Sequence, residues 1–90
     1  MEIINTTEHM ELKKSNISLI ELEDGQSGTI VSLNGGRNLT KRLADLGISP
    51  GTNITVLRRS LFSGPVQVEV AGSKLVLGRG LASKILVKPQ

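Results

Sequence analysis

Residues 65–71 read PVQVEVA, and this segment decides the fold because its apolar and polar side chains alternate strictly. In a β-strand, successive side chains point to opposite faces, so the three valines would share one face and Gln67 and Glu69 the other. β-branched residues at every second position are typical of strands with one buried face. The segment therefore predicts a strand whose valines lie in a hydrophobic core.

The same β-rich character returns in short runs that are separated by turn residues. These runs cover residues 28–33, 53–59, 74–77 and 85–88. Gly72-Ser73 lies between two of the predicted strands, where it suits a two-residue hairpin turn of type II′ with glycine first. Because strands this short cannot bury their apolar side chains in one open sheet, we expect a small barrel that removes the sheet edges. The predicted fold class is mainly β, an SH3-like barrel of about five strands.

One segment has the periodicity of a helix instead. Residues 37–46 (RNLTKRLADL) space their leucines by four and then three positions, which places them on one stripe at about 100° per residue. The leucine stripe consists of Leu39, Leu43 and Leu46. Gly47 suits the left-handed residue that follows a helix, and Pro50-Gly51 suits a β-turn. We expect one amphipathic helix inserted after the first strand, and a second short helical turn at residues 80–83.

The composition of the 90-residue chain excludes several classes of protein. It has no cysteine, so disulfides, thiolate metal sites and cysteine nucleophiles are excluded. His9 is the single histidine of the chain. One histidine is too few for most histidine-based catalysis and for the usual ferrous site, which has two imidazoles and a carboxylate. No apolar run approaches the roughly 18 residues of a membrane-spanning helix, and no signal-peptide pattern is present. We therefore expect a cytoplasmic protein with neither metal ligands nor a cofactor of its own.

The N-terminal residues differ from the rest of the chain. Residues 1–15 are polar and lack a clear period, and a second methionine, Met10, follows His9. This pattern predicts either a disordered leader or tag remnant over residues 1–15, or a naturally frayed terminus. A single domain is expected over residues 16–90.

Neither the acids nor the glycines of the chain form a recognisable chemical motif. Glu21, Glu23 and Asp24 could gather a divalent ion weakly, but a solvated loop before the barrel is the simpler interpretation. A phosphate-binding loop of the Walker A type needs a Gly-Lys dipeptide, which the chain lacks. No base is available to activate a hydroxyl in the predicted folded part, so we expect no enzymatic activity.

Several sequence blocks stand in a recognisable order and spacing: RLADLGISPG (42–51), ITV (54–56), GPVQVEV (64–70), LGR (77–79) and ASKILV (82–87). Together they resemble the FeoA family of ferrous iron transport proteins, from about residue 17 to residue 88. The same region resembles the C-terminal SH3-like module of iron-dependent repressors. The resemblance implies a small cytoplasmic accessory protein of bacterial ferrous iron uptake. The implied partner is FeoB, a membrane transporter with a GTP-binding domain on its cytoplasmic side.

The candidates for partner binding are surface residues. Arg42 lies at the edge of the leucine stripe, where its stem could cover the core with its head in water, or its guanidinium could meet a partner. Leu39 could belong to the core, which we favour, or form the exposed end of a groove. Phe62 could anchor its loop or, with Leu61 and two arginines, form a docking tip. The predicted partner-binding residues are Arg37, Leu39, Lys41, Arg42, Arg58, Arg59, Leu61 and Phe62.

Two other kinds of partner follow from the charge and from the short strands. The formal net charge of +3 and the sequence pI of about 9.7 make a nucleic-acid-binding barrel the alternative function. Against it stands the single aromatic residue, Phe62, because single-strand binders stack bases on aromatic side chains. An exposed strand edge could also pair with a second copy and give a weak homo-oligomer.

Overall fold

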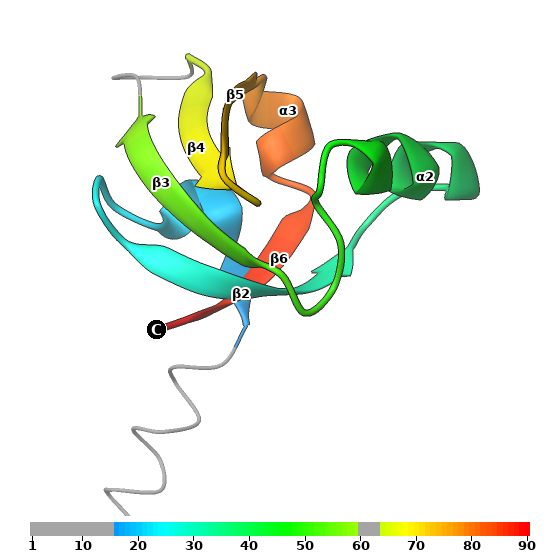
Figure 1. The fold of residues 1–90 in the computed structure, drawn as a ribbon, viewed down its shortest axis with the longest axis horizontal. Coiled ribbons are helices and arrows are strands. Elements are labelled where there is room, and N and C mark those ends of the chain that lie inside the picture. Colours follow the sequence, from blue (N-terminus) through cyan, green and yellow to red (C-terminus); the bar gives the residue numbers. More distant parts are fainter. Residues whose placement is uncertain (1–15, 60–63) are drawn as a thin grey trace, which may run out of the picture.

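The computed structural model describes residues 16–59 and 64–90, which form a curved antiparallel sheet with two helices beside it (Figure 1). The strands of this part are β1 (Ile17–Ser18), β2 (Ser27–Leu33), β3 (Asn53–Arg59), β4 (Val66–Val70), β5 (Ser73–Leu77) and β6 (Ile85–Pro89). The helices are α2 (Arg37–Asp45) and α3 (Arg79–Ala82), and the 3-10 turn η1 (Leu19–Glu21) follows β1. The strands pair in the order β1-β6-β2-β3-β4-β5.

The five predicted strands, the amphipathic helix and the short helical turn near the C-terminus are confirmed. In β4 the alternation holds at every position, with its three valines buried and Gln67 and Glu69 exposed. β1 and η1 were not predicted, because two and three residues are too few to show a period. A capping box holds η1: Ser18 Oγ accepts the Ile20 N–H at 3.4 Å, and the Glu21 carboxylate accepts the Ser18 N–H at 3.1 Å.

One hydrophobic core joins the sheet to all three helical elements. Leu19 and Leu22 enter it from the η1 segment, Leu43 from α2 and Ala82 from α3. Each large aliphatic side chain that is fully buried contributes roughly 1.5–3 kcal/mol relative to an exposed one. The remaining buried core residues are Ile30, Ile48, Ile54, Val56, Val66, Val68, Val70, Leu77, Ile85 and Val87.

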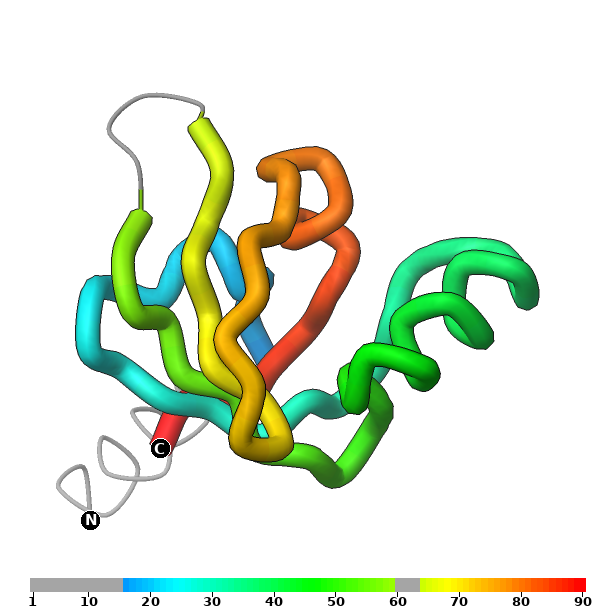
Figure 2. The backbone as a smooth tube through the Cα atoms, turned by 45° about the horizontal axis from the view of Figure 1, so that its top comes forward, coloured from blue at the N-terminus to red at the C-terminus, as the bar shows by residue number. Residues whose placement is uncertain are grey.

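Two bulges bend the sheet. The register of β2 against β6 shifts between Ile30 and Ser32, and that of β3 against β4 shifts between Val56 and Arg58. A bulge adds one residue to one strand, bends it and increases its twist. In β2 the extra residue shifts the alternation of inward and outward side chains by one position, so that both Ile30 and Leu33 pack on the core. Figure 2 follows the backbone around the resulting curve.

The barrel keeps two sheet edges, which corrects the expectation that curling removes them. Within residues 16–59 and 64–90, β5 pairs only with β4, and the two-residue β1 pairs only with β6. Closure would require β5 to pair with the other edge of β1, and no such pairing is present among the described residues. In this part of the chain, β5 therefore keeps one edge without a neighbouring strand.

The turn between β4 and β5 also differs from the prediction. Val70 pairs with Ser73, so the loop consists of Ala71 and Gly72 and not of Gly72 and Ser73. Both loop residues have positive φ, 52° at Ala71 and 80° at Gly72, which defines a type I′ turn and not type II′. The register of the valines decides this shift of one residue, because slipping it would turn the strand's core residues to solvent.

The end of α2 and the turn after it are as predicted. Gly47 has φ of 89°, and its N–H donates to the Ala44 carbonyl at 2.9 Å, while the Ile48 N–H donates to the Leu43 carbonyl at 2.9 Å. These are the two hydrogen bonds of a Schellman end. Gly51 has φ of 93° in the following turn. The chain thus leaves α2 in a defined direction, which fixes the helix beside the barrel.

Candidate functional site

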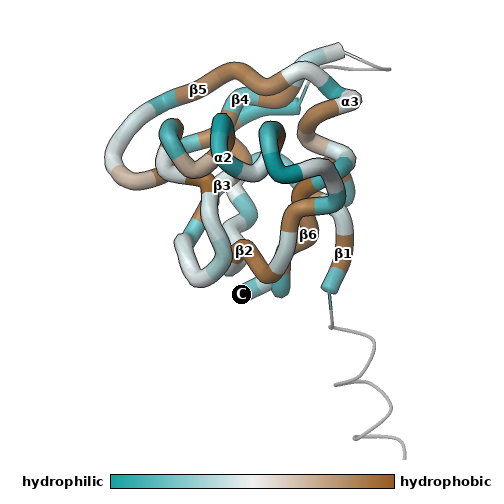
Figure 3. The backbone as a smooth tube through the Cα atoms, turned by 90° about the vertical axis from the view of Figure 1, so that its right-hand side faces the viewer, coloured by the Kyte–Doolittle hydropathy of each residue, from teal (hydrophilic) through white to brown (hydrophobic). Residues whose placement is uncertain are grey.

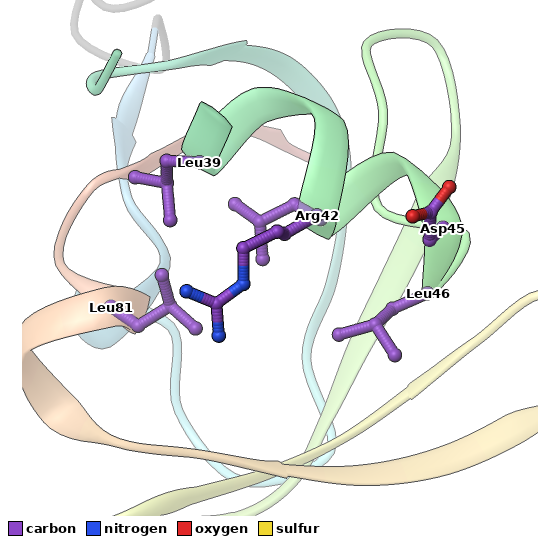
Figure 4. Close-up of a pocket in the computed structure, with 6 residues that line it drawn as sticks. Leu39, Arg42, Asp45, Leu46 and Leu81 are labelled. Carbon is purple, nitrogen blue, oxygen red and sulfur yellow. The ribbon is translucent and has the colours of Figure 1, made fainter. Parts of the chain in front are cut away.

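A groove lies between α2 and α3 on the helical side of the barrel (Figure 4). Its volume is about 370 Å³. Four leucines and two charged residues line it: Leu39, Arg42, Leu43, Asp45, Leu46 and Leu81. This combination of an apolar wall and a charged group suits the docking of a protein segment more than the holding of a small polar substrate.

The predicted leucine stripe of α2 forms one wall of the groove, and its burial is graded. Leu43 is fully buried in the core, Leu39 is half-buried, and Leu46 is 45% exposed. Leu39 therefore satisfies both interpretations made from the sequence, because it packs against the core and lines the groove. Leu46 is the C-cap of α2, at the end of the helix that is nearer the barrel (Figure 1), where it lines the groove and stays partly exposed.

Arg42 reaches into the groove from α2. Its guanidinium lies among the leucines in Figure 4, while the Asp45 carboxylate is turned away from it. In the described part of the chain, the guanidinium makes no hydrogen bond or ion pair. A planar fork of donors without a partner, held beside apolar side chains, is a geometry that recognises a carboxylate.

Leu46, Asp45 and Leu81 are groove residues that the sequence did not single out as binding residues. Leu46 belongs to the predicted leucine stripe, whose spacing does not indicate which of its leucines stays exposed. Leu81 comes from the predicted helical turn near the C-terminus, where it is half-buried beside the fully buried Ala82. Nothing in the local pattern says that this turn faces α2, because only the path of β5 and β6 brings α3 there.

The other predicted binding residues lie elsewhere or have other partners. Arg37 and Lys41 are exposed on α2 and do not line the groove, and Arg58 is exposed near the end of β3. The Arg59 backbone N–H donates to Asp24 Oδ1 at 2.8 Å, and its guanidinium donates to the Ile20 carbonyl at 2.9 Å. Arg59 therefore fastens β3 to the loop before β2. The predicted positions Leu61 and Phe62 lie outside the described residues.

Two of the three acids between β1 and β2 hold the fold together. The Glu21 carboxylate caps η1, and Asp24 accepts the hydrogen bond from β3. Within residues 16–59 and 64–90, no group of three or more histidine, aspartate or glutamate side chains could hold a metal ion. The same residues contain no helix with the length and apolar character needed to cross a membrane.

The comparison with known proteins decides the family. The model of the FeoA domain matches residues 17–89 of this chain. The chain belongs to the FeoA family. A curated relative, Fe(2+) transport protein A of Methanocaldococcus jannaschii, is 33% identical over 66 residues, which cover 73% of this chain and 78% of the relative. The resemblance that the sequence blocks indicate is therefore confirmed.

Solved structures confirm the fold. A crystal structure of the iron uptake regulatory protein FeoA superposes with a TM-score of 0.77 at 32% identity, covering 83% of this chain and 99% of that one. FeoA of Stenotrophomonas maltophilia in complex with zinc, a prokaryotic SH3 domain protein, gives a TM-score of 0.71 at 21% identity over 82% and 95% of the two chains. The predicted SH3-like fold is thus confirmed.

The sequence resembles a module of iron-dependent repressors, and the repressor found by comparison is manganese-dependent. A manganese-dependent transcriptional repressor superposes on the FeoA domain with a TM-score of 0.75 at 26% identity. The match covers 83% of this chain and 42% of the repressor. This chain therefore shares with the repressor one module of less than half its length.

Proposed function

We propose that this FeoA-family protein is an accessory protein of ferrous iron uptake that docks on the cytoplasmic side of a FeoB-type membrane transporter. The observation that carries the proposal is the Arg42 guanidinium, which has no polar partner among the described residues and lies in a groove walled by leucines. The family supplies the link to iron transport. The groove supplies the means of binding a protein.

The physical chemistry of the groove favours a protein partner. Covering the exposed part of Leu46 removes apolar surface from water, and the groove walls are already held in place by packing on the core. Arg42 would fix the orientation of the bound partner, because a charge-assisted hydrogen bond forms only with a correctly placed carboxylate or carbonyl. Apolar anchors around one arginine are a usual composition of binding hot spots.

The proposal assigns iron and nucleotide chemistry to the partner and not to this chain. Of the three acids that could have gathered a metal ion, Glu21, Glu23 and Asp24, the first and the last are engaged in hydrogen bonds of the fold. The chain has no Gly-Lys dipeptide for a phosphate-binding loop. We therefore propose a non-enzymatic role in which binding alone changes the state of the transporter.

A titration with the purified cytoplasmic part of a FeoB-type transporter tests the proposal. Leu46→Ser should weaken binding by about tenfold or more, because a leucine anchor contributes roughly 1.5–3 kcal/mol when buried. Val31→Ser is the matched control, since Val31 is a 37% exposed aliphatic residue on β2 outside the groove. Absence of binding by the unmodified protein, with and without guanine nucleotide, would overturn the proposed function.

An oligonucleotide titration examines the alternative of nucleic-acid binding. A basic protein gives charge-driven binding that falls steeply with salt and shows no base preference. Such binding would be consistent with the proposed function. Binding that stays tight at physiological salt and prefers one sequence would contradict it.

A further inference from the structure

β5 is an open sheet edge with a defined set of free backbone groups. The type I′ turn makes Val70 and Ser73 the closing hydrogen-bonded pair of the hairpin. Hydrogen-bonded and non-hydrogen-bonded pairs alternate along an antiparallel ladder, so Leu75 and Leu77 also direct their N–H and C=O groups to β4. Lys74 and Val76 direct theirs to the open side, where they meet no other backbone group of the described chain.

This open edge borders the leucine groove. In Figure 4, β5 passes along the side of the groove opposite α2, and α3 with Leu81 closes one end. Figure 3 shows the same arrangement from the helical side, with β5 running above α2 as a largely apolar band. The residues that line the groove come from α2, its C-cap and α3, and β5 lies beside it in both views. We call the groove and the adjacent β5 edge together the slot.

We propose that an extended segment of the partner enters this slot and adds to β5 as a further strand. Its backbone would pair with the free N–H and C=O groups of Lys74 and Val76. Its apolar side chains would meet the groove leucines, and an acidic side chain would meet Arg42. The inference rests on the proposed function, because it specifies how the transporter's cytoplasmic part occupies the groove.

The charges around the slot define the chemistry of this segment. Arg42 and Lys74 are exposed cations without ion pairs in the described chain, and the Asp45 carboxylate is turned away from Arg42. Val76 is 63% exposed and presents an aliphatic side chain on the same strand as the free backbone groups. A segment that carries both aliphatic and acidic side chains complements both features. Its backbone would lie about 4.8 Å from that of β5.

The shape of the slot favours a single strand over a second folded copy. α2 projects beside the open edge of β5 (Figures 1 and 3). A second barrel that paired its own β5 here would bring its own projecting helix to the same place. A lone extended segment needs only the width of one strand.

Amide hydrogen exchange, measured by NMR on the unmodified protein, tests the inference directly. Addition of the cytoplasmic part of a FeoB-type transporter should slow exchange of the Lys74 and Val76 amides by about tenfold or more. The Leu75 and Leu77 amides already donate to β4, so they serve as the internal reference. This measurement needs no variant.

Val76→Pro tests the same contact by removing its donor. Proline lacks an N–H and is tolerated on edge strands where the N–H faces outward, so the ladder to β4 remains. The variant should bind about tenfold more weakly than Val76→Thr, which keeps the N–H and the β-branch and changes the side chain alone. Circular dichroism and thermal unfolding check that both variants fold.

The outcomes separate this inference from the proposed function. If Leu46→Ser weakens binding while the Lys74 and Val76 amides exchange unchanged, the transporter uses the groove without strand addition, and the inference fails alone. If the unmodified protein does not bind, both fail. Protection of the two amides that rises with protein concentration in the absence of the transporter would show self-pairing and would overturn the inference.

Discussion

Gly47 and Ala71 approach so closely that a Cβ atom at Gly47 would lie 3.1 Å from the Cβ of Ala71. Gly47 follows α2 with φ of 89°, and Ala71 begins the β4–β5 turn with φ of 52°. The contact joins the end of α2 to the hairpin that carries β5. These are the two elements on either side of the proposed slot, so its width depends on this pair of left-handed residues.

Gly47→Ala should lower the free energy of unfolding by about 1–2 kcal/mol. The left-handed backbone at this position is strained for alanine, and the added Cβ would also crowd Ala71. Urea unfolding followed by circular dichroism measures the change. In an Ala71→Gly background the cost should be smaller by about 0.5 kcal/mol. Gly80→Ala is the control, since no atom lies within 4 Å of its added Cβ. Equal costs in the two backgrounds would contradict the contact.

Ala71→Asn should raise stability by roughly 0.5–1 kcal/mol. Asparagine followed by glycine is preferred in type I′ turns, because it adopts positive φ more readily than alanine. The urea midpoint reports the gain. Ala44→Asn, the same change at an exposed position of α2, should lower stability instead, because asparagine is the poorer helix former. A loss at both positions would argue against the type I′ turn.

Val68→Ala should lower the free energy of unfolding by about 2–3 kcal/mol. Val68 is fully buried at the centre of β4, so the change removes apolar contacts and leaves a cavity. Val76→Ala on the neighbouring strand should change it by less than about 0.5 kcal/mol, because Val76 is 63% exposed. Thermal unfolding of the two variants measures the difference. Similar losses would show that the two faces of the hairpin are assigned wrongly.

Asp24→Ala should cost about 0.5–1 kcal/mol, because it removes the acceptor of the Arg59 backbone N–H. Arg59→Ala should also lower stability, through loss of the bond to the Ile20 carbonyl. Arg58→Ala, at the exposed neighbour, should be within about 0.5 kcal/mol of the unmodified protein. Chemical unfolding compares the three. If the Arg59→Ala variant is as stable as the unmodified protein, the structural role of Arg59 is wrong and Arg59 is again a candidate for partner binding.

Arg42→Lys should weaken binding to the transporter's cytoplasmic part by about tenfold, because lysine keeps the charge but loses the planar fork. Arg37→Lys is the matched control on the same helix, since Arg37 does not line the groove. Isothermal titration calorimetry measures both affinities. Equal affinities for the two variants would show that Arg42 contributes only its charge.

The periodic elements could be predicted from the sequence. The alternation in β4 and the leucine spacing in α2 place residues on faces by geometry that belongs to each element alone. Gly47 and the Pro50-Gly51 turn act through local backbone preferences. The hairpin type was predicted wrongly, because the pairing of Val70 with Ser73 is a property of two strands and not of the turn residues.

The candidate site could be predicted only in part. Leu39 and Arg42 belong to one helix face, so their proximity follows from spacing of three residues. The exposure of Leu46 could not be predicted, since a stripe on an isolated helix does not reveal where the core ends. Arg59 could not be distinguished from Arg58, because its partners Ile20 and Asp24 are distant in sequence.

The amino-acid sequence by itself determined the strands, the helix and its end, and the family, because these depend on side chains within a few residues of each other or on blocks in order. Only the tertiary structure decided that Leu81 faces α2, that β5 keeps a free edge among the described residues, and that this edge lies beside the leucine groove. Those relationships arise where the bulged sheet curves segments of distant sequence into contact, and local periodicity carries no information about that curve.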